Sequence, residues 1–282
     1  ATVIGDAIEA AIIADTKSML TASNTTGTVT VTCDNDGTYG NYLPLEVIGS
    51  VAGVTAGVTG MSGGTTDPVL TSVLDVIGEE RYQAIVWPYA SDTTAVRTLL
   101  DARFDADVAV QDGVAFTAIN DTFANLGTLG DALNSQSLVI FGGKQETETA
   151  YSGGDIVEHP MIKAAVFAGY RALRLDSASF SVSDLVITAN GALDAFGGPA
   201  LASKPYFNTP ISTFTPIKTG RGFDNTEIES LLASGISLAG NNVAGNTVIF
   251  GEVVTTYKTD AAGNPDVSFK FLNYVDTATQ AR

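Results

Sequence analysis

Residues 83–116, QAIVWPYASDTTAVRTLLDARFDADVAVQDGVAF, decide the fold class of this chain. The stretch predicts an apolar strand over Gln83 to Trp87, a helix from about Asp92 to Phe104 capped by Ser91 or Asp92, and a strand over Asp107 to Phe116. Strands that are apolar on both sides and alternate with helices are typical of a mainly parallel sheet covered on two faces. We therefore predict an α/β fold.

The same alternation continues on both sides of this stretch. Proline at the first helical position marks two helix starts, at Pro68 and at Pro160. The predicted helices cover 68–78, 120–126, 160–175 and 224–233, and the predicted strands cover 137–142, 247–257 and 267–272. Between them, residues 191–222 are rich in Gly, Pro, Ser and Thr and predict an extended loop.

Burial can be assigned to particular residues of these elements. Ile85, Val86, Val139 and Ile140 are expected in buried strands, so Val86→Asp should prevent soluble expression. In the helix that starts at Pro160, four apolar residues fall on one face: Ile162, Val166, Tyr170 and Leu173.

The first 60 residues predict a small helix-plus-sheet unit. Apolar residues at helical spacing predict a helix from Thr2, its cap, to about Ala22. Alternating residues predict a pair of strands at 28–32 and 43–48, joined through turn-forming residues, and a further strand-like run that ends at Gly60. We expect a helix-plus-β-hairpin domain over 1–58 and an α/β body over 59–282.

Composition narrows the function. The chain has 14 Lys and Arg and 31 Asp and Glu, which gives a net charge of −17. This charge disfavours direct nucleic-acid binding and keeps copies of the chain apart. A single cysteine, Cys33, and a single histidine, His159, are too few for a disulfide framework or a Cys/His zinc site. The first twenty residues have no basic leader and no membrane-spanning run, and the chain reads as a soluble fragment or processed form of something longer.

One motif raises the question of catalysis. Residues 60–64, GMSGG, match G-x-S-x-G, which in hydrolases places a serine at a strand-to-helix elbow. Ser62 would be the nucleophile, and His159 is the only histidine that could serve as its base. However, Thr65 to Pro68 separate the serine from the next helix, so a glycine-rich connector is the favoured interpretation. A serine hydrolase stays the alternative.

Other candidate sites have a plainer explanation. The loop 34–37, DNDG, and the later Asp260, Asn264 and Asp266 have oxygen ligands suited to calcium, but Asp, Asn and Gly are also what a tight turn selects. Residues 142–144, GGK, lack the remainder of a phosphate-binding loop, and 235–237, GIS, lack the second glycine of an elbow. Trp87 and Tyr89 are expected at the core and its rim. No catalytic, cofactor-binding or metal-binding residue is nominated.

Several ordered motifs nevertheless form a pattern along the chain. They are GTVTVT at 27–32 with Gly37 and GN at 40–41, VTGMSGGTTDP at 58–68, IVWPY at 85–89, 99–104, QDGVAF at 111–116, LGTLG at 126–130 with NS at 134–135, LL at 231–232, GI at 235–236, and TTY at 255–257 with DAAG at 260–263. Their order and spacing over about residues 2–276 resemble the contractile tail sheath proteins of Mu-like bacteriophages and related tailocins. The proline-rich run expected within about 176–222 is absent, which leaves the conformation of that segment open.

The resemblance implies a structural subunit rather than an enzyme, with no cofactor. In such sheaths many copies form a helical tube around the tail tube, and on a baseplate signal they rearrange into a shorter, wider tube that drives the tail tube through the host envelope for genome ejection. The implied partners are other copies of the chain, tail tube proteins and baseplate proteins, and the implied location is the virion tail, after synthesis in host cytoplasm. Terminal arms that add strands to neighbouring subunits are also implied, and without them this chain is expected to be monomeric. A virion carbohydrate-binding or adhesin module is a third possibility.

Overall fold

The computed structural model describes residues 1–43, 45, 47, 52–78, 80, 82, 84–103, 113–144, 158–176, 222–241, 247–250 and 253–266. The chain divides into two compact units, whose boundary along the first part of the sequence falls between Val69 and Leu70. We call them the small unit and the body, and each is described by itself. The predicted domain boundary between residues 58 and 59 stays a prediction.

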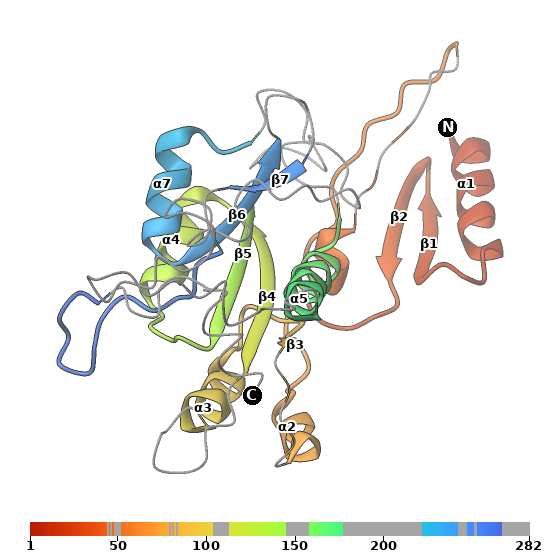
Figure 1. Ribbon diagram of the computed structural model, residues 1–282. Helices are drawn as coiled ribbons and strands as arrows, with labels where there is room; N and C mark the ends of the chain where they lie inside the picture. Colours follow the sequence, from red (N-terminus) through yellow and green to blue (C-terminus); the bar gives the residue numbers. More distant parts are fainter. Residues whose placement is uncertain are drawn as a thin grey trace. The chain divides into compact units, whose positions relative to one another are not determined.

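The small unit consists of a helix, a hairpin and a short 3-10 helix. Its elements are α1 (Thr2–Ala14), β1 (Leu20–Thr25), β2 (Thr28–Cys33) and η1 (Tyr39–Tyr42). The antiparallel strands β1 and β2 are joined by Thr26 and Gly27, which both have positive φ, 54° and 94°. A two-residue turn of this kind matches the twist of paired strands and fixes their register. Helix α1 lies alongside β1 (Figure 1).

Several predictions for this unit were wrong. Helix α1 ends at Ala14 rather than Ala22, and no side chain caps its start, where Ala1 is the N-cap. The partner of β2 is β1, not 43–48, because the tight turn at Thr26 brings the preceding residues back along β2. Of that predicted strand, the described residues 43, 45 and 47 lie outside any strand, as do residues 54–60.

The body is built on a five-stranded mixed sheet. Its helices are α2 (Thr71–Ile77), α3 (Thr94–Arg103), α4 (Phe123–Asp131), α5 (Pro160–Asp176) and α7 (Asn225–Ala233); its strands are β3 (Ala84–Val86), β4 (Val114–Asp121), β5 (Leu138–Lys144), β6 (Ile236–Asn241) and β7 (Thr247–Phe250). The strand order is β3-β4-β5-β6-β7, with parallel pairs up to β6 and an antiparallel pair between β6 and β7. The predicted α/β class with a mainly parallel sheet is confirmed.

Alternate residues of the central strands enter two separate cores. On one face, Phe116 and Phe141 pack against α5, where Phe141 stacks on Phe167. On the other face, Leu138 and Ile140 join a cluster that includes residues of α3, α4 and α7. Figure 1 shows α5 on one side of the sheet and α4 and α7 on the other. Period-two burial on both faces explains why these strands are apolar throughout.

Most body elements agree with the sequence, and several bounds do not. The predictions for β3, β5, α5 and α7 are confirmed, and the predicted helix from about Asp92 corresponds to α3. Strand β4 runs on to Asp121 instead of ending at Phe116, so α4 begins later than predicted, at Phe123. Helix α2 begins at Thr71 rather than Pro68. Strand β6 was not predicted.

Some predictions fall wholly or partly outside the described residues. The predicted strand 247–257 ends at Phe250 in the structure, and residues 253–257 form no named strand. The described residues do not include 107–112, 177–221 or 267–272.

One burial prediction was also wrong. Val139 and Ile140 are completely buried, but Val86 is 42% exposed, because it ends the three-residue edge strand β3. Of the four apolar residues predicted on one face of α5, Ile162 is 52% exposed and Val166 is partly buried against the core, whereas the side chains of Tyr170 and Leu173 lie outside the described residues. The described buried residues of α5 include Lys163, Ala164, Phe167 and Ala168.

None of the helices in the part of the chain that the structure describes has the length and apolar character needed to cross a lipid bilayer.

Candidate functional site

A polar network in the described part of the body centres on Asn134, which follows α4. Its side-chain oxygen accepts the backbone N–H groups of Lys258, at 2.6 Å, and Thr259, at 3.1 Å. Its amide nitrogen donates to the carbonyl and the hydroxyl of Thr259, at 2.9 and 3.0 Å. One side chain thus holds a segment about 125 residues away in sequence.

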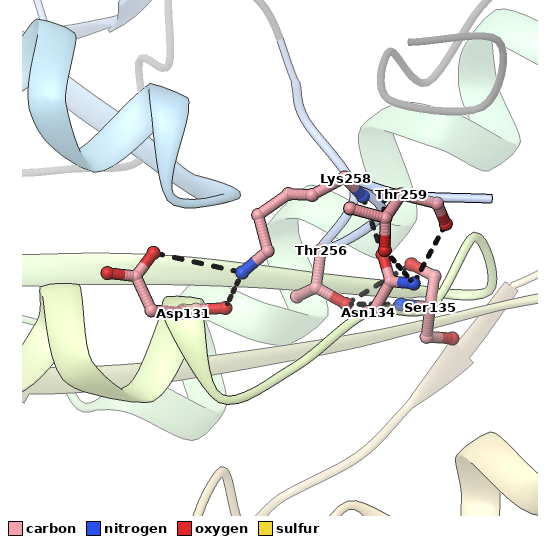
Figure 2. A network of polar contacts seen from close by, with 7 residues as sticks. Asp131, Asn134, Ser135, Thr256, Lys258 and Thr259 are labelled. Carbon is pink, nitrogen blue, oxygen red and sulfur yellow. Dashed lines mark hydrogen bonds and ion pairs between the residues drawn. The ribbon is translucent and has the colours of Figure 1, made fainter. Parts of the chain in front are cut away.

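Two hydroxyl residues extend this network to the sheet. Thr256 Oγ1 accepts the N–H of Ser135 and donates to its carbonyl, both at 3.1 Å, and both residues are buried. The backbone N–H of Thr256 donates to the carbonyl of Leu138, the first residue of β5. We call Asn134, Ser135, Thr256, Lys258 and Thr259 the body clasp (Figure 2).

Lys258 closes the clasp on its other side. Its ammonium group donates to the carbonyl of Gly130 and lies 3.8 Å from the carboxylate of Asp131, both at the end of α4. The last carbonyl groups of a helix have no partner within the helix, and a cation there also interacts favourably with the helix dipole. Lys258 therefore satisfies the end of α4 while it anchors its own segment.

Beyond the clasp the chain forms a tight turn. Asp260 accepts the N–H groups of Ala262 and Asn264 at 2.9 and 2.8 Å, and its second oxygen accepts the side-chain amide of Asn264. The hydrogen bond from the Asn264 side chain is the largest of the causes that hold the pKa of Asp260 below its ordinary value. An isolated bridge between Thr259 and Pro265 closes the turn.

A second contact supports the base of this turn. The hydroxyl of Tyr257 donates to the carboxylate of Asp266 at 2.8 Å, and this hydrogen bond raises the pKa of Tyr257. Asp260, Asn264 and Asp266, whose oxygen atoms would also suit calcium, thus bond to groups within the turn and at its base.

The small unit has a clasp of its own. Thr38 donates both its backbone N–H and its hydroxyl to one carboxylate oxygen of Asp67, each at 2.7 Å. Asn41 bonds to the backbone of Gly64 in both directions, accepting its N–H at 2.8 Å and donating to its carbonyl at 2.9 Å. We call these four residues the small-unit clasp. Asp67 thus bonds to Thr38 and caps no helix, and α2 begins beyond Pro68, at Thr71.

The proposed hydrolase residues do not have the geometry of a nucleophile elbow. Ser62 is exposed and lies in a segment without helix or strand, and the next helix, α2, begins only at Thr71. An elbow needs the helix to start directly after the serine. His159 is buried at the start of α5, where its Nδ1 accepts the N–H of Met161. The two residues belong to different units.

The remaining candidates have structural roles in the described part of the chain. Among the described residues, no group of three or more His, Cys, Asp or Glu side chains is placed to hold a metal ion. Lys144 ends β5 and forms an ion pair of 3.2 Å with Glu227, which also belongs to the capping box of α7. Trp87 is buried, and its indole N–H donates to the carbonyl of Asp92.

Sequence reasoning missed two kinds of polar residue. Lys163 is 2% exposed and its ammonium group donates to Asn120 at 2.6 Å, although lysine is seldom buried and nothing in its neighbourhood marks it. Asn134 and Thr256 were noted only as parts of motifs. Their roles depend on contacts across more than a hundred residues, which local patterns do not carry.

Comparison with known proteins was made for the whole chain. No family profile matches it. A curated relative, the Mu-like prophage FluMu tail sheath protein of Haemophilus influenzae, is 24% identical over 290 aligned residues, which cover 100% of this chain and 52% of the relative. The chain thus spans about half the length of that relative. The resemblance to tail sheath proteins of Mu-like phages, first drawn from ordered motifs, is confirmed by a relative that aligns with the entire chain.

Proposed function

We propose that this chain is part of a structural subunit of a phage contractile tail sheath. The observation that carries the proposal is that the motifs of the resemblance meet in space at the two clasps. Asn134 and Ser135 belong to one motif and Thr256 to another, and they bond to each other in the body. In the small unit, Asn41 of the GN motif bonds to Gly64 of the glycine-rich motif.

This arrangement suits a mechanical role better than a catalytic one. The polar side chains at the clasps bond to backbone groups of distant segments, so that they fix the fold rather than leave donors and acceptors aimed at a substrate. A serine hydrolase at Ser62 and His159 has no observation in its favour beyond the motif.

In a sheath, the body would keep its own structure while its contacts with neighbouring subunits change from one arrangement to another. The extended sheath would store energy in one set of contacts between subunits and release it on contraction into another set, and such a change needs an element that moves as a unit. The body clasp holds the segment 256–259 to the end of α4 and to β5, so this late segment would move together with the sheet. The proposed partners are other copies of the chain, the tail tube and the baseplate, within the virion tail.

Electron microscopy of the whole protein tests the proposal. The gene product that contains this chain, expressed with its tail tube partner, should form hollow tubes of uniform width. Single particles without tubes, at concentrations at which a known sheath polymerises, would contradict it.

A paired substitution tests the alternative catalytic role. Ser62→Ala with His159→Gln should leave the yield and length of the tubes unchanged. Tube formation without any ester hydrolysis, in both the original and the substituted protein, is the expected result, and a hydrolytic activity that Ser62→Ala removes would favour the hydrolase instead.

A further inference from the structure

One residue of the small unit has a backbone conformation that its side chain disfavours. Thr66 has a φ of 65°, in the left-handed region, and lies in a segment without helix, strand or turn. A left-handed backbone crowds the Cβ atom of an L-residue, and a β-branched side chain makes this conformation a genuine outlier. Thr26 shares the positive φ, but the hairpin turn that it forms requires one. Thr66 has no such local reason and is therefore strained.

The small-unit clasp holds the chain on both sides of Thr66. On the N-terminal side, Gly64 exchanges two hydrogen bonds with Asn41. On the C-terminal side, one carboxylate oxygen of Asp67 accepts two hydrogen bonds from Thr38. The strained residue thus lies between two anchored points.

The two segments joined by the clasp also approach closely along their backbones. A Cβ atom on Gly64 would collide with the carbonyl oxygen of Gly37, and one on Gly37 would lie 2.8 Å from the carboxylate of Asp67. Directly after Asp67, Pro68 has a fixed φ and restricts the backbone of the residue before it. Any adjustment of this segment therefore falls on the two threonines at 65 and 66.

The strained residue lies near the end of the small unit, whose boundary with the body falls between Val69 and Leu70. We call residues 64–69 the connector. Strained backbones persist only where the surrounding structure over-determines them, and they are concentrated at functional sites and switch regions. Hinges likewise consist of a few loop residues that absorb a change in φ and ψ.

We propose that the small-unit clasp is a latch that holds the connector in a strained state, and that opening the clasp turns the connector into a hinge. With the clasp open, Thr66 relaxes to a negative φ and the chain leaves the small unit in another direction. Strain at Thr66 makes the clasp easier to open than its hydrogen bonds alone would. The inference goes beyond the proposed sheath function, because it assigns a conformational device to the small unit whether or not tubes form.

Hydrogen exchange at the Thr38 N–H measures how often the clasp opens. Thr66→Gly removes the steric penalty of a positive φ, whereas Thr65→Gly, the matched control, adds the same chain freedom at a residue whose φ is not positive. Thr38 should exchange at least about fivefold more slowly in Thr66→Gly than in Thr65→Gly, because the left-handed penalty of an L-residue shifts an equilibrium by that factor. Equal exchange in the two variants would overturn the proposal.

Loss of the Asn41 hydrogen bonds tests the hinge. In Asn41→Ala, the backbone chemical shifts of Thr66 should move to those of a negative φ. Thermolysin should cut between Val69 and Leu70 at least about fivefold faster, because two hydrogen bonds no longer hold the connector. Asn35→Ala is the matched control, because the Asn35 side chain is exposed and donates to Met19, and it should leave both measurements unchanged.

The hairpin provides the folding control. Exchange at the Asp34 N–H, which donates to the carbonyl of Met19 at 2.9 Å, verifies that the small unit stays folded in Asn41→Ala. If Thr66 keeps its positive φ and the cleavage rate is unchanged while the hairpin is intact, the proposal is wrong. If the hairpin is lost in this variant, the two glycine variants decide, because they retain every hydrogen bond of the clasp.

Discussion

At the scale of single residues, Asn134 provides hydrogen bonds that a neighbouring strand would otherwise provide. The segment 253–259 has no ladder of its own in the described structure, and its backbone groups are satisfied largely by side chains. An asparagine offers both a carbonyl and an amide, so it can pair with a backbone as another peptide group would. The residue therefore decides where this segment lies relative to α4 and β5.

Asn134→Ala should destabilise the body. The change removes four hydrogen bonds that hold Lys258 and Thr259, which we expect to cost about 1–3 kcal/mol of unfolding free energy. Urea unfolding of the chain measures it. Asn125→Ala is the matched control, because the Asn125 side chain donates one hydrogen bond, to Asp121 four residues away, and should cost much less. Equal losses for both variants would contradict a special role for the clasp.

The Asp260 turn should respond to acid. Because the pKa of Asp260 is lower in the fold, its charged form stabilises the turn above the ordinary pKa of an aspartate, about 3.9, and that contribution is lost as pH falls through the lowered pKa. A carboxyl NMR titration measures the pKa directly. In Asn264→Ala, which removes the largest cause of the shift, the pKa should move back toward its ordinary value. An unchanged pKa would mean that other groups hold the charge.

At the scale of elements, the local sequence pattern correctly predicted the helices and strands that have long apolar runs or a clear start signal. Strand β5 has continuous apolar residues and α5 begins with Pro160, and both were placed correctly. Strand β6, ISLAGN, has serine and glycine in its interior and is defined by its neighbours β5 and β7, which sequence does not reveal. The hairpin partner was wrong because Thr26, a residue that rarely has positive φ, forms the turn.

The candidate sites also divide into those that the local sequence predicts and those that depend on contacts between distant residues. Turn residues such as Asp260 and Asn264 lie close in sequence, so a turn could be predicted as one of their two interpretations. The clasp needs contacts between residues 134 and 259, and the buried Lys163 contradicts the ordinary preference of lysine for the surface.

Burial also reverses one expectation about substitutions in strands. Val86→Asp should now be tolerated, with soluble expression, because Val86 is 42% exposed on an edge strand. Val139→Asp, in a strand with neighbours on both sides, places an unpaired charge in a completely buried position and should prevent soluble expression. The soluble fraction of each variant decides the matter. Insoluble Val86→Asp protein beside soluble Val139→Asp protein would contradict the assigned burial.

At the scale of the whole molecule, several of the motifs that resemble tail sheath proteins contain the residues that connect distant segments of the chain. Each clasp connects two pieces of the resemblance that are far apart in sequence, and each does so with small polar side chains that bond to backbone groups. Such joints require particular residues at particular positions, whereas core positions accept many apolar residues of suitable volume.

The net charge of −17 governs the last prediction, which concerns self-association. In dilute solution at moderate salt the chain should be a monomer by light scattering, because repulsion between acidic surfaces opposes contact between copies. Raising the salt concentration shortens the screening length from about 10 Å at 0.1 M to about 3 Å at 1 M, so association should increase. Contacts held by ion pairs would instead weaken as salt rises. A stable ring or filament from the dilute chain would mean that this part of the protein alone carries the principal assembly contacts.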